Sequence, residues 1–348
     1  GEWCFVAAEK IPLSDRMRII LLLVSASLAA SLHVHPQPPS YRPTVASFAP
    51  RASPVCVSTP SSGSELRFRG ARELTRIRGG TAGVNKWLAS AGGLATSAAV
   101  TGAANLFGLA FTLATGSHKL TDLVGSGCFA FSAIATLLMG GNSSSPRLLA
   151  STSLISVWSV RLASFLFYRI LMTDKDDRLG KVFATTSGTV TFWVLSFLWG
   201  FVVLMPHSMS CFAASSAPLD GAGYAAAGLA AVAFVVEAVA DWQKWTFKNK
   251  PEGKTTWCAE GLWKFSRHPN YAGEITFWWS IFALNAPNLA AHWPGLALGA
   301  VSPIFITLLI RFVSGVNLAE ARNDGRFGKS REYQEYKKRT PMLFPGVL

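Results

Sequence analysis

Long apolar segments alternate with short polar loops along most of the chain. From Leu94 onward, each apolar segment has roughly the 20 residues that an α-helix needs to cross the hydrocarbon core of a bilayer. The sequence therefore predicts an all-α, polytopic membrane bundle with about seven transmembrane helices. The predicted spans cover residues 94–115, 121–140, 148–172, 188–206, 222–241, 272–290 and 295–315.

The composition agrees with this pattern. Of 348 residues, 50% are hydrophobic and only 15% are charged, whereas a soluble domain has about 25% charged residues. The five cysteines are scattered without a CxxC pair, so neither a disulfide framework nor a zinc or other metal site is indicated. The formal net charge of +13 does not indicate nucleic acid binding, because the cations lie in short loops between spans.

The cations are also distributed unequally between the two sides of the membrane. With seven spans, the loops after spans three and five and the tail after span seven lie on one face, and the opposite loops contain only Arg147. The basic face is therefore predicted to face cytosol or stroma. Its cations are Lys175, Arg178 and Lys181; then Lys244, Lys248, Lys250, Lys254, Lys264 and Arg267; then Arg322, Arg326, Lys329, Arg331, Lys337, Lys338 and Arg339.

The first part of the chain, residues 1–80, has a different character. Met17 precedes a short apolar core, and a stretch rich in Pro, Ser and Arg follows it. We predict a disordered signal- or transit-like presequence, cleaved between Ser31 and Asn85, before a membrane domain at residues 81–348. The segment 46–50, ASFAP, is similar to the cleavage-site motif of bipartite plastid presequences. A plastid membrane is therefore one predicted location and the endoplasmic reticulum the alternative; an ordinary disordered tail also fits the composition.

The most informative polar segment is 260–274, which lies between two apolar segments. Lys264, Arg267 and His268 fall within five residues, and Pro269 suits the first turn of a helix. A helix N-terminus with cations beside it favours an anion, which suggests a phosphate-bearing cofactor. The alternative is a basic loop that contacts lipid phosphates.

Charged residues also occur inside the predicted spans. Arg161 lies near the middle of span three, where a charge costs ~2.5–3.5 kcal/mol on insertion scales, so we expect it to face the bundle. Glu237, Asp241 and Lys244 share one face of a helix. The two carboxylates need a cation, which Arg161 or Arg311 could supply. This set either contacts a cofactor or forms an ion-pair cluster that only orders the bundle.

The C-terminal tail carries Tyr333 and Tyr336, three residues apart and therefore on one face of a short helix. Their rings could stack on an adenine or donate to a phosphate. An amphipathic helix at the membrane interface is the alternative.

Several of these segments resemble one family. GLWKFSRHPNYAGE, followed by Trp278 and Trp279, closely resembles the motif of the DUF1295 family, which belongs with the steroid 5-alpha-reductase C-terminal-domain proteins. Sterol delta-14 and delta-7 reductases and isoprenylcysteine carboxyl methyltransferases are relatives of this group. The resemblance runs from Val157 to Pro345 and includes VWSVRLASFLFYRI, EAVADWQKWTFK and the tail from Glu320.

The resemblance implies a membrane reductase that transfers hydride from NADPH to a carbon–carbon double bond of a small hydrophobic, steroid-like or other lipid substrate. The cofactor-binding residues that it implies are Glu237, Asp241, Lys244, Lys264, Arg267, Asn270, Glu274, Glu320, Tyr333, Tyr336 and Arg339. The proton donor is not identified; Tyr271 and His268 are the catalytic candidates.

Two other functional classes stay open. An isoprenylcysteine-type methyltransferase would share the RHPNY turn and the tail but would bind S-adenosylmethionine, and a non-catalytic membrane scaffold would keep the fold alone. The sequence shows no Ser–His–carboxylate set, P-loop or Rossmann glycine fingerprint. Beyond the lipid bilayer it indicates no obligate protein partner.

Overall fold

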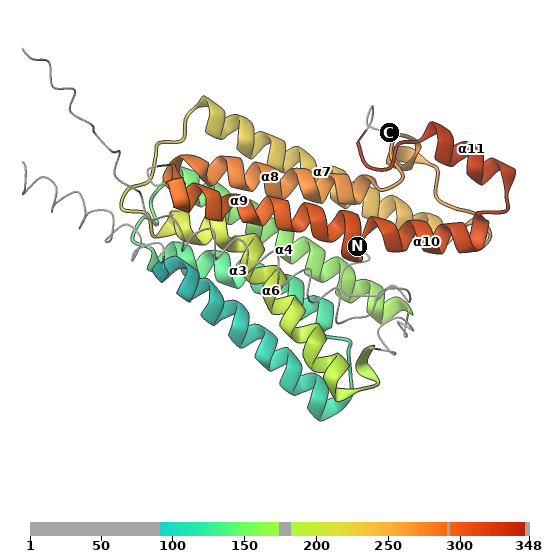
Figure 1. Cartoon of the computed structure of the whole chain (residues 1–348), viewed down its shortest axis with the longest axis horizontal. Coiled ribbons are helices and arrows are strands. Elements are labelled where there is room, and N and C mark those ends of the chain that lie inside the picture. Colours follow the sequence, from blue (N-terminus) through green and yellow to red (C-terminus); the bar gives the residue numbers. More distant parts are fainter. Residues whose placement is uncertain (1–90, 174–181, 291–292, 345–348) are drawn as a thin grey trace, which may run out of the picture.

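The computed structural model describes residues 91–173, 182–290 and 293–344, and every regular element in these ranges is a helix (Figure 1). The first is Ala91–Thr115. The others are α3 (Thr121–Met139), α4 (Pro146–Thr173), α6 (Thr186–Cys211), α7 (Gly221–Lys248), α8 (Pro269–Leu289), α9 (Trp293–Leu308), the π-helical η3 (Leu309–Ser314), α10 (Val316–Phe327) and α11 (Arg331–Arg339), with the 3₁₀ turns η1 (Glu252–Lys254) and η2 (Gly261–Lys264).

The predicted all-α membrane bundle is confirmed. Within the described ranges, six helical segments are long and apolar enough to cross a membrane: Ala91–Thr115, α3, α4, α6, α7 and the stretch Trp293–Phe327, which comprises α9, η3 and α10. The remaining predicted span corresponds to α8, which has 21 residues and packs against α7 and α9. Helix α8 buries polar side chains, including Asn270, Glu274, Asn285 and Asn288. The predicted presequence and the loop with Lys175, Arg178 and Lys181 lie outside the described residues.

Local sequence fixes where several helices begin. The side chain of Thr185 accepts a hydrogen bond from the Gly188 N–H at the start of α6, and Asp220 accepts from Gly223 N–H at the start of α7. These bonds satisfy backbone donors that have no partner within the helix. Pro269 occupies the first turn of α8, as predicted, because its missing N–H costs nothing there.

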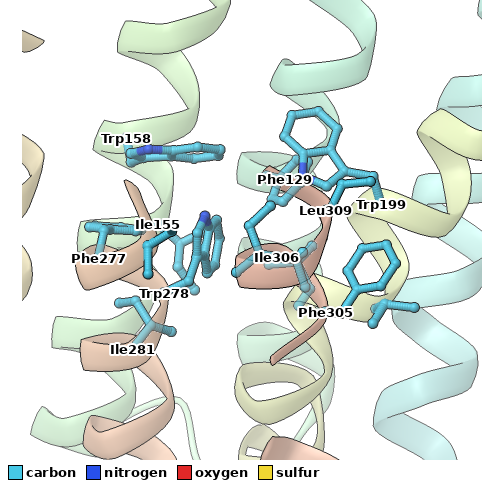
Figure 2. Packing of buried hydrophobic residues seen from close by; sticks show 14 of the residues in the cluster. Phe129, Ile155, Trp158, Trp199, Phe277, Trp278, Ile281, Phe305, Ile306 and Leu309 are labelled. Carbon is cyan, nitrogen blue, oxygen red and sulfur yellow. The ribbon is translucent and has the colours of Figure 1, made fainter. Parts of the chain in front are cut away.

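An aromatic cluster forms the centre of the bundle (Figure 2). The Trp158 ring on α4 lies 4.9 Å from Trp278 and 5.7 Å from Phe277, both on α8. Phe129 on α3 lies 4.7 Å from Trp199 on α6. These centroid distances are within the range of favourable ring pairs. The cluster therefore fixes how α4 and α8 are rotated relative to each other, and this positions the polar residues one or two turns away.

Arg147 corrects one detail of the predicted charge distribution. The sequence pattern predicts that Arg147 lies in a loop opposite the basic face. In the structure it lies in the first turn of α4 and is 1% exposed. Its guanidinium pairs with Asp220 at 2.9 Å and donates to the carbonyls of Leu284 and Pro218. Arg147 therefore ties α4 to α7 and α8 rather than adding a free charge to that face.

The C-terminal end of α7, the N-terminal end of α8, α10 and α11 meet at one end of the bundle, on the right in Figure 1. We call it the basic end, because Lys244, Lys248, Arg267, Arg326 and Lys337 gather there. This arrangement agrees with the predicted placement of those cations on one face.

Candidate functional site

The turn before α8 is held by the C-terminal tail. His268 precedes the helix with an extended φ of −142°, which suits a residue before proline. The backbone N–H of Arg267 donates to the Pro341 carbonyl at 2.9 Å, and the Ser266 hydroxyl donates to the Met342 carbonyl. The tail is thereby fixed across the start of α8.

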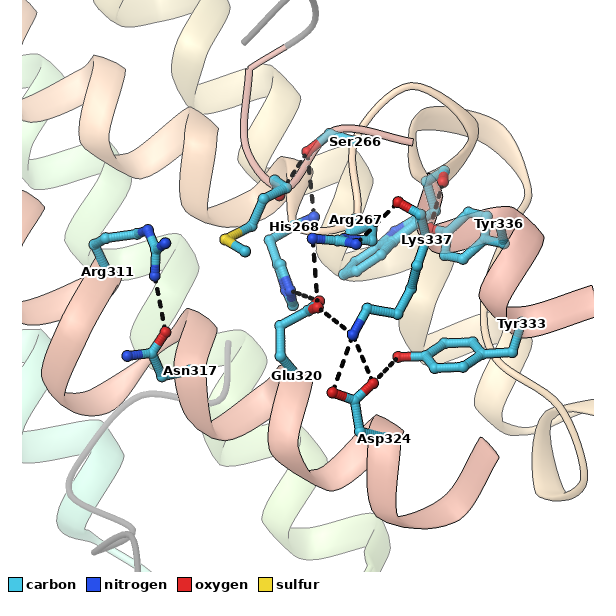
Figure 3. Close-up of polar contacts among 12 residues, drawn as sticks. Ser266, Arg267, His268, Arg311, Asn317, Glu320, Asp324, Tyr333, Tyr336 and Lys337 are labelled. Atoms are coloured by element: carbon cyan, nitrogen blue, oxygen red, sulfur yellow. Dashed lines mark hydrogen bonds and ion pairs between the residues drawn. The ribbon is translucent and has the colours of Figure 1, made fainter. Parts of the chain in front are cut away.

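Glu320 on α10 organises the charges around this turn (Figure 3). One carboxylate oxygen accepts from His268 Nε2 at 2.7 Å, and the other lies 3.4 Å from both Arg267 Nη2 and Lys337 Nζ. Lys337 also contacts Asp324 at 2.7 Å. The network joins α8, α10 and α11, so the basic end is a single packed unit.

Burial favours the neutral form of the His268 ring. The side chain is buried, which lowers its pKa below the ordinary value, although the hydrogen bond to Glu320 acts in the opposite direction. Nε2 carries the proton that is donated to Glu320. Nδ1 is then an acceptor, and it has no hydrogen-bond partner among the described residues.

Aromatic rings and cations line a pocket beside this network. Lys244 lies 4.6 Å from the centroid of the Trp263 ring, and Trp257 lies 5.1 Å from that of Tyr333. Burial raises the pKa of Tyr336 above its usual range, so its hydroxyl stays protonated, and it donates to the Trp263 carbonyl. We call this the basic-end pocket. Its lining includes Lys244, Lys248, Trp257, Arg267, Arg326, Tyr333 and Tyr336.

A second polar group, the carboxylate cluster, lies inside the bundle. The guanidinium of Arg161 contacts Glu237 at 3.1 Å and Asp241 at 2.9 Å. The Asn270 side-chain N–H donates to the other oxygen of Asp241 at 3.0 Å. Of the two candidate cations, the structure selects Arg161, because Arg311 instead donates to Asn317 in the first turn of α10 (Figure 3).

Glu274 is the unusual member of this region. It is 0% exposed, and neither carboxylate oxygen has a hydrogen-bond partner among the described residues. The Oδ1 atom of Asn270 and the indole nitrogen of Trp278 also lack one. These three residues are four apart on α8 and share a face. Buried polar groups are normally paired, so this face of α8 is unusual in carrying several polar atoms without a hydrogen-bond partner among the described residues.

Two contacts connect the pocket with the carboxylate cluster. The His268 and Tyr271 rings stack with centroids 5.5 Å apart, and Tyr271 is adjacent to Asn270 in the chain. The Trp263 indole donates to the carbonyl of Ala240, next to Asp241. The basic-end pocket and the carboxylate cluster are therefore adjacent to each other.

The predicted site residues fall into three sets. Lys244, Arg267, Glu320, Tyr333 and Tyr336 line the basic-end pocket; Glu237, Asp241, Asn270 and Glu274 lie in the cluster or beside it; and the ring pair His268–Tyr271 connects them. Lys264 and Arg339 are exposed and lie outside the pocket lining. Their expected role in holding phosphate has no geometric support here.

The sequence interpretation missed Trp158 and Trp257. The Trp158 indole donates to Glu237 at 2.8 Å. Its position three residues before Arg161 was an available signal, because residues i and i+3 share a helix face. Trp257 lies in a loop, where no periodic pattern could indicate that it joins Tyr333 and Tyr336.

Fold and site together define a polytopic helical membrane protein with a buried carboxylate cluster and a cation-lined pocket at its basic end. The chain belongs to the family described as "Protein of unknown function (DUF1295)", whose model matches residues 108–340. This confirms the family recognised in the sequence. Neither curated proteins nor solved structures give a match. The matched range contains both the basic-end pocket and the carboxylate cluster.

Proposed function

We propose that the protein is a membrane-embedded reductase that uses NADPH to reduce a carbon–carbon double bond of a lipid substrate. The observation that carries this proposal is the position of Glu274. The buried carboxyl group of Glu274, which has no hydrogen-bond partner among the described residues, lies on the α8 face that begins at a pocket lined by cations and aromatic rings. A large anionic cofactor with an amide-bearing head needs both of these environments.

The basic-end pocket suits the phosphate and adenine parts of such a cofactor. Lys244, Lys248, Arg267 and Arg326 face this pocket, and the Arg267 Nε–H has no acceptor among the described residues. Guanidinium groups bind phosphate through charge-assisted hydrogen bonds. The rings of Trp257 and Tyr333 offer apolar faces to a base.

The α8 face suits the other end of the cofactor. A nicotinamide carboxamide has two N–H donors and one carbonyl acceptor. Oxygens of Asn270 and Glu274 are available as acceptors, and the Trp278 indole N–H is available as a donor. NADPH would supply the hydride, and these side chains would orient its carboxamide.

The proton for the second step must come from a group near the substrate. Tyr271 and His268 stay the candidates. The His268 Nε2 proton is engaged by Glu320. Tyr271 is buried beside Asn270 and one turn from Glu274, which makes it the stronger candidate for a donor.

One observation favours the alternative cofactor. Glu237, Asp241 and Glu274 supply three carboxyl groups, and Arg161 is the cation that pairs with two of them. A surplus of buried carboxylate suits a positively charged ligand. The sulfonium of S-adenosylmethionine is such a cation, so a methyltransferase is the second candidate.

The test is a direct comparison of NADPH and S-adenosylmethionine binding to the purified full-length chain, by calorimetry in detergent. Binding of NADPH alone supports the reductase, and binding of S-adenosylmethionine alone supports the methyltransferase. If neither ligand binds, although a thermal transition shows that the protein is folded, a non-catalytic scaffold is favoured instead.

We further propose a plastid membrane as the location, with the endoplasmic reticulum as the alternative, from the Arg- and Ser-rich presequence. A fluorescent fusion that is found only in the endoplasmic reticulum would exclude the plastid.

A further inference from the structure

An apolar groove lies between the first described helix, Ala91–Thr115, and α6, and it has a volume of about 290 Å³. Ala98 and Gly102 form one wall, and their small side chains leave space opposite Phe197. Leu106 and Val194 are exposed at its rim. Since both helices are membrane spans, this rim faces lipid. The groove approaches the size of small-ligand pockets, ~300–1,000 Å³.

The groove contains one polar side chain without a full set of partners. Asn105 is 3% exposed and lines the groove. Its Nδ2 donates to the Thr101 carbonyl at 2.8 Å, which fixes the orientation of the amide because a carbonyl can only accept. Its Oδ1 has no hydrogen-bond partner among the described residues. The nearby Cys128 thiol directs its S–H at the Gly125 carbonyl.

The depth of Asn105 restricts what can supply the missing donor. Asn105 lies 14 residues after Ala91 and ten before Thr115, hence about 21 Å and 15 Å from the two helix ends at 1.5 Å per residue. Phospholipid headgroups stay at the surface of a hydrocarbon core ~30 Å thick. A donor that comes from the surrounding bilayer at the depth of Asn105 must therefore belong to a molecule that dissolves in the hydrocarbon.

We propose that this groove binds a lipid alcohol, with its apolar body against Gly102 and Phe197 and its hydroxyl donating to Asn105 Oδ1. A buried amide oxygen without a donor is costly, and a ligand hydroxyl removes that cost. An alkane or an ether of the same length fills the groove but leaves Oδ1 unpaired. The inference is independent of the proposed reductase activity, because no residue of the groove belongs to the basic-end pocket or the carboxylate cluster.

The experiment uses the full chain in nanodiscs and a hexadecanol that carries a diazirine for photo-crosslinking. Label is expected on peptides that contain Leu106 and Val194. Unlabelled hexadecanol should compete at about three- to tenfold lower concentration than its methyl ether, because one hydrogen bond separates them. Equal competition by the two compounds, or label spread evenly over the lipid-facing helices, would overturn the proposal.

Three variants separate the hydrogen bond from the shape of the groove. Asn105→Leu should abolish the preference for the alcohol over the ether while the chain still binds both. Gly102→Leu should fill the groove and remove specific labelling. Gly228→Leu is the matched control, because a side chain at this α7 glycine meets open space, and it should label like wild type. An alcohol preference that survives in Asn105→Leu would refute the role of Oδ1.

Discussion

The indole N–H of Trp158 on α4 donates to the carboxylate of Glu237 on α7, over 2.8 Å, inside the membrane-spanning part of the bundle. Arg161, one turn further along α4, contacts the other oxygen of the same carboxylate. Glu237 is thus held by two side chains of one neighbouring helix, while Glu274 on α8 has no hydrogen-bond partner among the described residues. This contrast separates residues that stabilise the bundle from a residue that is available to a ligand.

Arg161→Ala is expected to destabilise the protein by about 3–5 kcal/mol, because two buried carboxylates would lose their cation. The measurement is the thermal transition of the purified protein in detergent. Arg311→Ala is the matched control, since Arg311 contacts a neutral, exposed Asn317 and should change stability little. Equal transitions for the two variants would contradict the assigned role of Arg161.

Glu274→Met is expected to leave the thermal transition unchanged or raise it, because the Glu274 carboxyl group makes no hydrogen bond to the described part of the chain. NADPH binding should weaken by about three- to tenfold, the loss expected for one hydrogen bond. Glu237→Met serves as the comparison and should lower the transition, because it leaves the Trp158 indole N–H without its acceptor and removes one of the two carboxylates that pair with Arg161. A Glu274 variant that unfolds more easily but binds normally would show a structural role instead.

Arg267→Ala is expected to reduce NADPH affinity by about ten- to a hundredfold through loss of a charge-assisted phosphate contact. Titration of the purified variants with NADPH measures this change in affinity. Lys264→Ala is the control, because Lys264 is also a cation and lies only three residues away, but it is exposed and outside the pocket lining. The NADPH affinity of this variant should therefore match that of the wild type. Thermal transitions are recorded for both, because Arg267 also donates to the Lys337 carbonyl. Parallel losses in the two variants would indicate a general charge effect rather than a site.

Stability should fall as the pH is lowered below about 6.5, the ordinary His pKa. Burial lowers the pKa of His268 in the folded protein, so the unfolded chain binds a proton at a higher pH than the folded protein does. The free energy of unfolding therefore falls by up to about 1.4 kcal/mol for each pH unit, until the pKa of the folded protein is reached. Thermal transitions at pH 7.5 and 5.5 measure the effect. His268→Gln keeps a donor for Glu320 and should show a smaller decrease; the same decrease in both proteins would assign it to other groups.

Epitope tags in the loop around Pro251 and after Leu348 are expected on the same side of the membrane, with a tag near Ser215 on the other. Between Pro251 and α11, the chain crosses the bundle in α8 and returns in α9 and η3, so Pro251 and α11 both lie at the basic end. Protease protection of intact and permeabilised membranes measures this. Opposite accessibility of the Pro251 and C-terminal tags would exclude α8 as a span.

The sequence by itself determined the features that depend on one segment of chain. Apolar length gave the helices, Pro269 gave the start of α8, and the three-residue spacing of Tyr333 and Tyr336 placed both on the buried face of α11. The RHPNY segment was sufficient for the family. Such features are local, because helix periodicity and turn preferences are properties of adjacent residues.

Tertiary structure decided which side chains meet. The sequence could not choose between Arg161 and Arg311 as the partner of Glu237, since the choice depends on how α4 and α7 are rotated and packed. It placed Arg147 in a loop, although the carbonyls and Asp220 that satisfy it come from residues more than 70 positions away. It grouped Lys264 with Arg267 because they are near in the chain, yet only Arg267 turns toward the pocket. The absence of a partner for Glu274 within the described bundle is likewise visible only after the neighbouring helices are in place, because desolvation and hydrogen bonding depend on the surroundings that they create.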